Sequence, residues 1–182
     1  MARNTLSRAL HDLGLSAWFG GTLANAVALN PAAAQADTAN GTGRVANTGW
    51  NKWTPVNAAA IGALLTGSIG ELVGNRARLV GQRGVGTTAV AKTGLTAAAL
   101  AVTGYSRLLG RKVAKETSVP ALAATEPAAS TPASVAKAQK QLSVLQWVVP
   151  VLTGALIVVS SLAGEQQRAS EVKKGFLARF TH

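Results

Sequence analysis

Residues 141–164 read QLSVLQWVVPVLTGALIVVSSLAG, a stretch without a charged side chain. A helix needs about 17 to 25 predominantly apolar residues to cross a hydrocarbon core of roughly 30 Å. A helix on the surface of a soluble protein would show a charged or polar face along its length, and this stretch does not. It therefore predicts a transmembrane helix.

Three further runs have the same character. Residues 13–36 and 53–70 carry no charge, and residues 84–106 carry only Lys92. We therefore predict an all-α fold, a polytopic membrane helical bundle of about four transmembrane helices with antiparallel up-down topology. The third run is rich in Ala and Thr and contains a lysine, which leaves a bundle of three spans open as an alternative.

The length of the chain favours a single transmembrane domain over residues 1–182. The expected helices cover about 9–31, 56–75, 85–115 and 132–165, the last beginning at Thr131-Pro132, a typical helix start. Between and after them we expect a turn-rich connection over 37–55, a flexible Ala/Pro/Thr linker over 116–131 and a basic C-terminal tail over 166–182.

The first run has a second interpretation as a signal peptide. Arg3 and Arg8 precede it, and Ala34-Gln35-Ala36 before Asp37 resembles a cleavage site. The apolar region is longer than the usual stretch of about 7 to 15 residues, and it contains two asparagines. These features favour a retained helix.

The charge balance is strongly basic, because 18 Lys and Arg face 7 Asp and Glu. Such a balance indicates either nucleic acid or anionic lipid as a partner. The cations lie between apolar runs and accompany no nucleic-acid recognition motif, so we expect the lipid bilayer and anionic lipids as partners and no nucleic acid. Residues 173–180 mix cations with Phe and Leu, which fits an interfacial segment or a solvated basic tail.

Tryptophans stand at two entries to the apolar runs. Trp50 and Trp53 precede the second run, and Trp147 lies near the start of the fourth. Amphipathic indole rings collect at headgroup depth, so we predict that all three are interfacial anchors. For Trp147 a role in packing is an equally good interpretation.

Small residues recur at every fourth position of the second run. We predict that they form one helix-packing face, against the third helix or a helix of another protein. The third run has a similar series in Val90, Gly94 and Ala98. The residues of the predicted face on the second run are Ala58, Gly62, Thr66, Gly70 and Gly74.

Ionisable residues inside apolar runs are costly and are therefore the best candidates for function. His11, Asp12, Glu71 and Lys92 would lie at one membrane face in an up-down bundle. Our hypothesis is that Glu71 pairs with Lys92, because each offsets the desolvation of the other, and that His11 or Asp12 joins this polar cluster. A structural role is favoured over proton coupling or ligand binding, since these sites lie near the helix ends.

Catalytic and cofactor chemistry has little support. There is no cysteine, and His11 and His182 are the only histidines, which argues against thiolate sites, His-rich metal sites and bis-histidine haem. The serines belong to no recognisable nucleophile motif, and the glycine-rich residues 81–86 lack the ending of a phosphate-binding loop. We expect no catalytic residue, no cofactor and no metal.

Two features carry a resemblance. The Ala/Gly-rich composition and the loop over 121–134 are similar to small four-helix membrane proteins of high-GC actinobacteria. The segments His11-Asp12-Leu13-Gly14 and Trp18-Phe19-Gly20-Gly21 resemble the first helix of several four-helix bacterial membrane families. The resemblance implies a multi-pass protein of a bacterial plasma membrane and carries no activity with it.

These observations favour a non-enzymatic accessory or scaffold subunit of a membrane complex, with partner membrane-protein subunits or a homo-oligomer. The alternative is a small transporter or permeability protein that uses the polar cluster. A third possibility is a membrane-surface adaptor acting through the basic loops and tail.

Overall fold

The computed structural model describes residues 4–82, 84–115, 121–168 and 170–172. The predicted all-α class is confirmed, and three of its helices, α3, α4 and α5, are long and apolar enough to cross a membrane. The elements in chain order are α1 (Thr5–Ala24), the π-helical segment η1 (Asn25–Leu29), α2 (Asn30–Ala33), α3 (Ala39–Gly81), α4 (Val85–Lys115), β1 (Ala121–Ala123), β2 (Glu126–Pro127) and α5 (Ala133–Glu165).

The first apolar run forms a continuous helical path through α1, η1 and α2. The π-helical segment ends at Leu29, two residues before Pro31. A proline ring lacks an N–H and would clash with the carbonyl four residues earlier, at Val27, and a π-helical turn relieves that clash. The prediction that this run is helical therefore holds, with the start at Thr5.

The predicted turn-rich connection over 37–55 is wrong for most of its length. α3 begins at Ala39 and contains every glycine and asparagine on which that prediction rested. The Thr38 side chain caps the helix by accepting a hydrogen bond from the Gly41 N–H at 3.0 Å. Packing outweighs the weak helix propensity of this segment, because Gly49 lies against Leu29 and Ala46 is buried.

The predicted linker over 116–131 is a small hairpin where the structure describes it. β1 and β2 pair in antiparallel fashion, with Ala121 opposite Pro127 and Ala123 opposite Glu126. Ala121 is 1% exposed, so the hairpin is packed against the helices. Residues 116–120 and residues 173–182 of the predicted basic tail lie outside the described residues.

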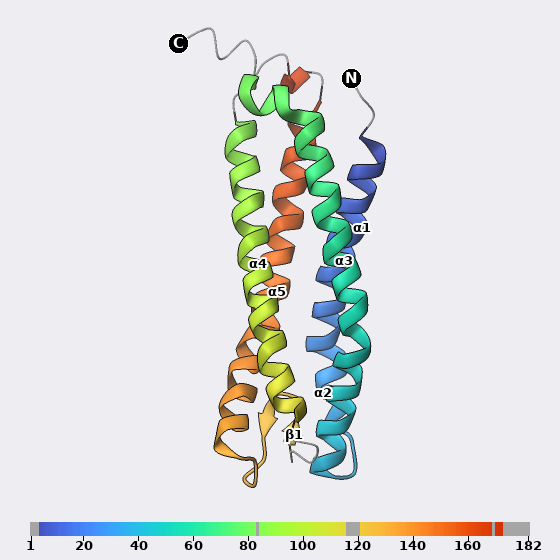
Figure 1. The fold of residues 1–182 in the computed structure, drawn as a ribbon, viewed down its shortest axis with the longest axis vertical. Helices are drawn as coiled ribbons and strands as arrows, with labels where there is room; N and C mark the ends of the chain where they lie inside the picture. Colours follow the sequence, from blue (N-terminus) through green and yellow to red (C-terminus); the bar gives the residue numbers. More distant parts are fainter. Residues whose placement is uncertain (1–3, 83, 116–120, 169, 173–182) are drawn as a thin grey trace.

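The helices pack as two pairs, α1 with α3 and α4 with α5 (Figure 1). Within the first pair the backbones meet closely, since a Cβ on Gly14 would reach the backbone of Leu64 and one on Gly67 would reach the backbone of His11. The shared core includes Leu15, Trp18, Leu64, Ala99 and Leu156.

The two ends of the bundle differ in how the chain turns (Figure 1). One end, here called the turn end, holds the end of α3 at Gly81 and the start of α4 at Val85, and Gly84 before α4 takes a φ of +84°, which favours glycine. At the opposite end, here called the hairpin end, lie β1 and β2. The sides of the bundle expose large apolar residues such as Leu13, Ile69, Val90 and Val151, and such a surface suits a bilayer.

Candidate functional site

The predicted small-residue face on α3 divides into two parts. Gly70 and Gly74 do face α1, because a Cβ at these positions would collide with Ser7 and Asn4. Gly62 has open space around it, and Ala58 and Thr66 are exposed. Each step of four residues rotates by about 40° around a helix of 3.6 residues per turn, so five such positions cannot share one face. The prediction of a single packing face is therefore wrong.

The corresponding series on α4 also points outward. Val90 is 73% exposed, Ala98 is exposed, and a Cβ on Gly94 would meet no atom within 4 Å. These residues do not meet α3. The outward faces of both helices thus carry small side chains that nothing in the described chain covers.

The tryptophans predicted as interfacial anchors take two roles. The Trp50 indole N–H donates to Asn30 Oδ1 at 3.0 Å, and the Trp53 ring lies where a Cβ on Gly21 would be. Both rings therefore pack inside the protein, in contrast to the predicted anchoring role. Trp147 is 47% exposed on α5, as an outward-facing ring would be.

The predicted ion pair between Glu71 and Lys92 is present near the turn end. Lys92 Nζ lies 3.2 Å from Glu71 Oε2. The Lys92 side chain is 18% exposed and the Glu71 side chain 19%. His11 is buried, and its Nδ1 lies 2.8 Å from Oδ1 of the mostly exposed Asp12. All four residues border one cavity of about 310 Å³.

Further hydrogen bonds join the two helix pairs at the turn end. Arg78 of α3 and Gln82 directly after it both donate to the Gln166 carbonyl oxygen after α5, at 2.7 and 3.0 Å, and Arg8 donates to Gln167. Burial, aided by the nearby Arg8, lowers the pKa of the Arg78 guanidinium, which nevertheless stays charged at any physiological pH. This end of the molecule is held together by charges that largely have partners.

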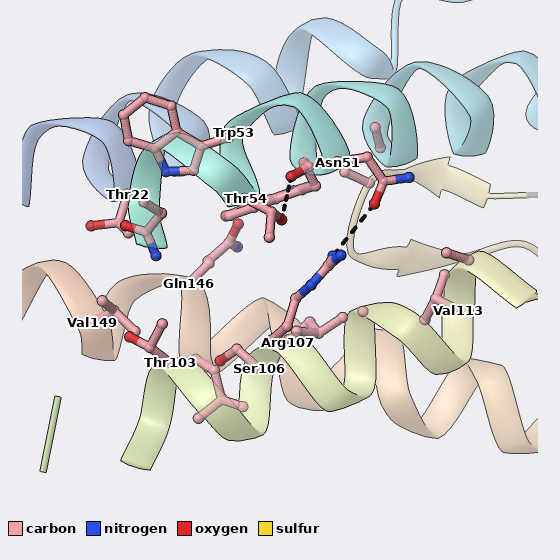
Figure 2. Close-up of a pocket in the computed structure, with 18 of the residues that line it drawn as sticks. Thr22, Asn51, Trp53, Thr54, Thr103, Ser106, Arg107, Val113, Gln146 and Val149 are labelled. Atoms are coloured by element: carbon pink, nitrogen blue, oxygen red, sulfur yellow. Dashed lines mark hydrogen bonds between the residues drawn. The ribbon is translucent and has the colours of Figure 1, made fainter. Parts of the chain in front are cut away.

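A larger cavity of about 390 Å³ lies between the helix pairs toward the hairpin end. α3, α4 and α5 form its walls, and the β1–β2 turn lies at its edge. Its apolar lining includes Ile61, Leu100, Leu142, Leu145 and Val149. Figure 2 shows Trp53 and Thr54 of α3 facing Thr103 and Ser106 of α4 across this space.

Four buried polar atoms on the wall of this cavity have no hydrogen-bond partner within the described chain. They are Trp53 Nε1, Asn57 Oδ1, Thr103 Oγ1 and Ser106 Oγ. Buried polar atoms in folded proteins nearly always have a partner, and each one without a partner costs about 1 to 3 kcal/mol. All four atoms belong to residues that line the same cavity.

Asn30 joins three segments at the wall of the cavity. Its Oδ1 accepts from Trp50 on α3, and its Nδ2 donates to Gln146 Oε1 on α5 at 2.7 Å. Asn30 itself is buried. The polar side chains around the cavity thus fall into a bonded group, which holds the helices, and a group of lining residues whose buried polar atom has no partner in the described chain.

The sequence does not predict this cavity. From the sequence we predict an interfacial role for Trp53 and no role for Asn57, Thr103 and Ser106, which are polar residues in or beside apolar runs. Their spacing carried a signal, because Thr103, Ser106, Arg107 and Gly110 recur at helical intervals and share one face of α4.

In the described part of the chain, no three His, Asp or Glu side chains gather as a metal site would require. Ser160 Oγ and His11 Nε2 border the smaller cavity, and neither has a hydrogen-bond partner among the described residues. Comparison with known protein families, with curated proteins and with solved structures gives no match to this chain.

Proposed function

We propose that this protein is a non-enzymatic membrane protein of four antiparallel spans that holds a small amphiphilic molecule between its two helix pairs. One observation carries the proposal, namely the cavity of about 390 Å³ on which four unpartnered buried polar atoms converge. A mostly apolar cavity with a few convergent polar groups is the usual form of a small-molecule site.

The proposed fourth span is the first apolar run. Its outward residues Leu6, Leu13 and Val27 are exposed and apolar, like those of the three longer helices. Its inner face lies against α3 from Asn4 near Gly74 to Leu29 near Gly49, so the two run side by side in opposite directions over this stretch of α3. The resemblance to bacterial four-helix proteins supports placing it in a bacterial plasma membrane.

The chemistry of the wall supports an amphiphile over a fully polar solute. Side chains such as Ile61, Leu100 and Val149 offer apolar contact, whereas the hydroxyls and the indole N–H lie on the α3 and α4 sides. A purely polar solute would lose its hydration without recovering it on the apolar wall. A ligand with an apolar body and a polar group satisfies both.

Native mass spectrometry of the full chain with added dodecanol tests this proposal. We expect one bound dodecanol per chain, and we expect Gly110→Phe to abolish it because Gly110 lies on the wall and the new ring would fill the space. Gly94→Phe is the matched control, since a side chain there also enters open space but outside this cavity. Binding that survives Gly110→Phe would contradict the proposal.

A second candidate is the accessory subunit expected from the composition. It is favoured by the uncovered small residues Gly62 and Thr66 on α3 and Gly94 and Ala98 on α4, which suit close contact with another transmembrane helix. Cross-linking in native membranes tests it. Gly62→Phe should remove a cross-linked partner, and an unchanged cross-link pattern would speak against this role.

A further inference from the structure

Arg107 is the single charged side chain among the described residues that line the larger cavity. Its guanidinium donates a hydrogen bond to a neutral amide, from Nη1 to Asn51 Oδ1 at 3.4 Å. It forms no ion pair with a described carboxylate. Figure 2 shows the guanidinium reaching from α4 toward Asn51 on α3.

The depth of Arg107 fits a headgroup position. It directly follows residues 84–106, the apolar run of α4, and α4 continues for eight more residues to Lys115, about 12 Å at 1.5 Å per residue. A cation at this boundary avoids the hydrocarbon centre, where a lone charge is most costly. Arg107 therefore borders the apolar cavity from a position outside the hydrocarbon centre.

Two hydroxyls beside Arg107 differ from nine other helical hydroxyls of this chain. Nine Thr and Ser side chains in the described helices donate back to the carbonyl oxygen four residues earlier, as Thr93 and Thr96 do on α4. Thr103 and Ser106 lack such a bond, although their oxygens are buried at the cavity wall. They share one face of α4 with Arg107, which leaves two uncommitted hydroxyls beside a guanidinium.

The residues around the hairpin end carry a net positive charge, like Arg107 itself. Eight Lys and Arg lie in residues 31–55 and 105–145, which flank the hairpin end, against three acids. Such a field attracts anions and repels cations. A carboxylate head is the partner that a guanidinium with neighbouring hydroxyls binds best.

We propose that the larger cavity binds a single-chain amphiphile with a carboxylate head, the head on Arg107, Thr103 and Ser106 and the hydrocarbon chain among the apolar residues deeper in the bundle. The volume of about 390 Å³ lies at the small end of the usual range of ligand cavities, which suits one chain better than a two-chain lipid. This inference rests on the proposed function, because it names the ligand class of the same cavity.

Isothermal titration of the full chain in nanodiscs of a neutral phospholipid tests the inference, with dodecanoate, dodecanol and dodecyltrimethylammonium as matched probes. We expect dodecanoate to bind about ten- to a hundredfold more tightly than dodecanol, since hydrogen bonds to a charged group contribute about 1.5 to 3 kcal/mol. Arg107→Gln should remove this preference while leaving dodecanol affinity unchanged. Arg107→Lys should retain part of it, because the charge stays and the forked geometry is lost.

Arg111→Gln is the control for charge alone. Arg111 lies four residues further along α4, is exposed, and does not line the cavity, so its loss should leave the ratio of dodecanoate to dodecanol affinity unchanged. If Arg107→Gln does not fold, the wild-type ratio and the Arg107→Lys ratio still decide the matter.

The outcomes separate the two proposals. Equal affinities of the wild type for dodecanoate and dodecanol, or tighter binding of the ammonium probe, would overturn the carboxylate inference and leave the binding cavity intact. An equal loss of preference in Arg111→Gln and Arg107→Gln would overturn it as well. No saturable binding of any probe, or binding that Gly110→Phe does not affect, would overturn the proposed function itself.

Discussion

The turn end and the hairpin end of this bundle are built from similar residues but use them differently. At the turn end, Glu71 and Lys92 form an ion pair, and Arg78 and Gln82 bind the Gln166 carbonyl oxygen. At the hairpin end, Arg107 has a neutral partner and four neighbouring polar atoms have none in the described chain. The difference shows that the polar residues of a membrane bundle fall into two groups. Some have hydrogen-bond or ion-pair partners within the chain, and others do not.

Reversing the charge of Glu71 should have the largest effect on stability. Glu71→Lys would put a second cation beside the largely buried Lys92, and we expect the free energy of unfolding to fall by about 3 kcal/mol or more. Chemical denaturation in neutral detergent micelles measures it.

The double variant Glu71→Lys with Lys92→Glu restores an ion pair and should recover most of the loss. A double variant as unstable as the sum of the two single variants would show that the pair does not couple α3 to α4.

Filling the contact between α1 and α3 should have the next largest effect. Gly67→Val would push a side chain into the backbone of α1 at Ser7 and His11, so we expect a loss of about 2 to 3 kcal/mol. Gly62→Val, on the uncovered face of the same helix, should change the free energy of unfolding by less than about 0.5 kcal/mol. Equal losses in the same denaturation assay would reject the division of the small-residue series into two faces.

Removing the Trp50 hydrogen bond should have a smaller effect. Trp50→Phe leaves the buried Asn30 Oδ1 without its donor, which should cost about 1 to 2 kcal/mol. Trp147→Phe changes an exposed ring and should cost less than about 0.5 kcal/mol in the same assay. If Trp147→Phe proved the more costly of the two, the interior role assigned to Trp50 would be wrong.

The smallest effect should have the opposite sign. Thr103→Val removes a buried hydroxyl that has no partner in the described chain, so the free energy of unfolding without ligand should rise by about 1 kcal/mol. Binding of dodecanoate should weaken in the same variant. Thr93→Val removes a hydroxyl that already bonds the Ala89 carbonyl oxygen at 2.9 Å, and neither quantity should change by a comparable amount. A loss of stability in Thr103→Val would indicate that its hydroxyl is satisfied.

The absence of charged residues predicts the bounds of a helix well where that helix ends at a charged or proline-rich segment. The predicted ranges 85–115 and 132–165 compare with Val85–Lys115 and Ala133–Glu165 in the structure. The same reasoning wrongly predicts a turn-rich connection for residues 39–55. Glycines and asparagines favour turns in isolation, and only contact with α1 and α2 makes this segment helical. That contact cannot be predicted from the composition of the segment alone.

The candidate site divides in the same way. The Glu71–Lys92 pair could be predicted because up-down topology alone brings the end of one run beside the start of the next. The cavity could not be predicted from the sequence. It depends on the distance between the two helix pairs and on which face of α4 points toward the interior of the bundle. Thr103 and Thr93 are alike in sequence terms, and only the rotation of α4 separates their environments.

Asn30 has a mechanical consequence. The Asn30 side-chain amide forms hydrogen bonds with Trp50 on α3 and Gln146 on α5, and so connects the two helix pairs at the level of the cavity. A ligand that spreads the pairs at this level must break the bond between Asn30 and Gln146, whereas the bond between Trp50 and Asn30 stays within one pair. The bond from Arg107 to Asn51 also joins the two pairs, and at 3.4 Å it is longer than the 2.7 Å bond of Asn30, so the cavity is held more firmly on the Asn30 side.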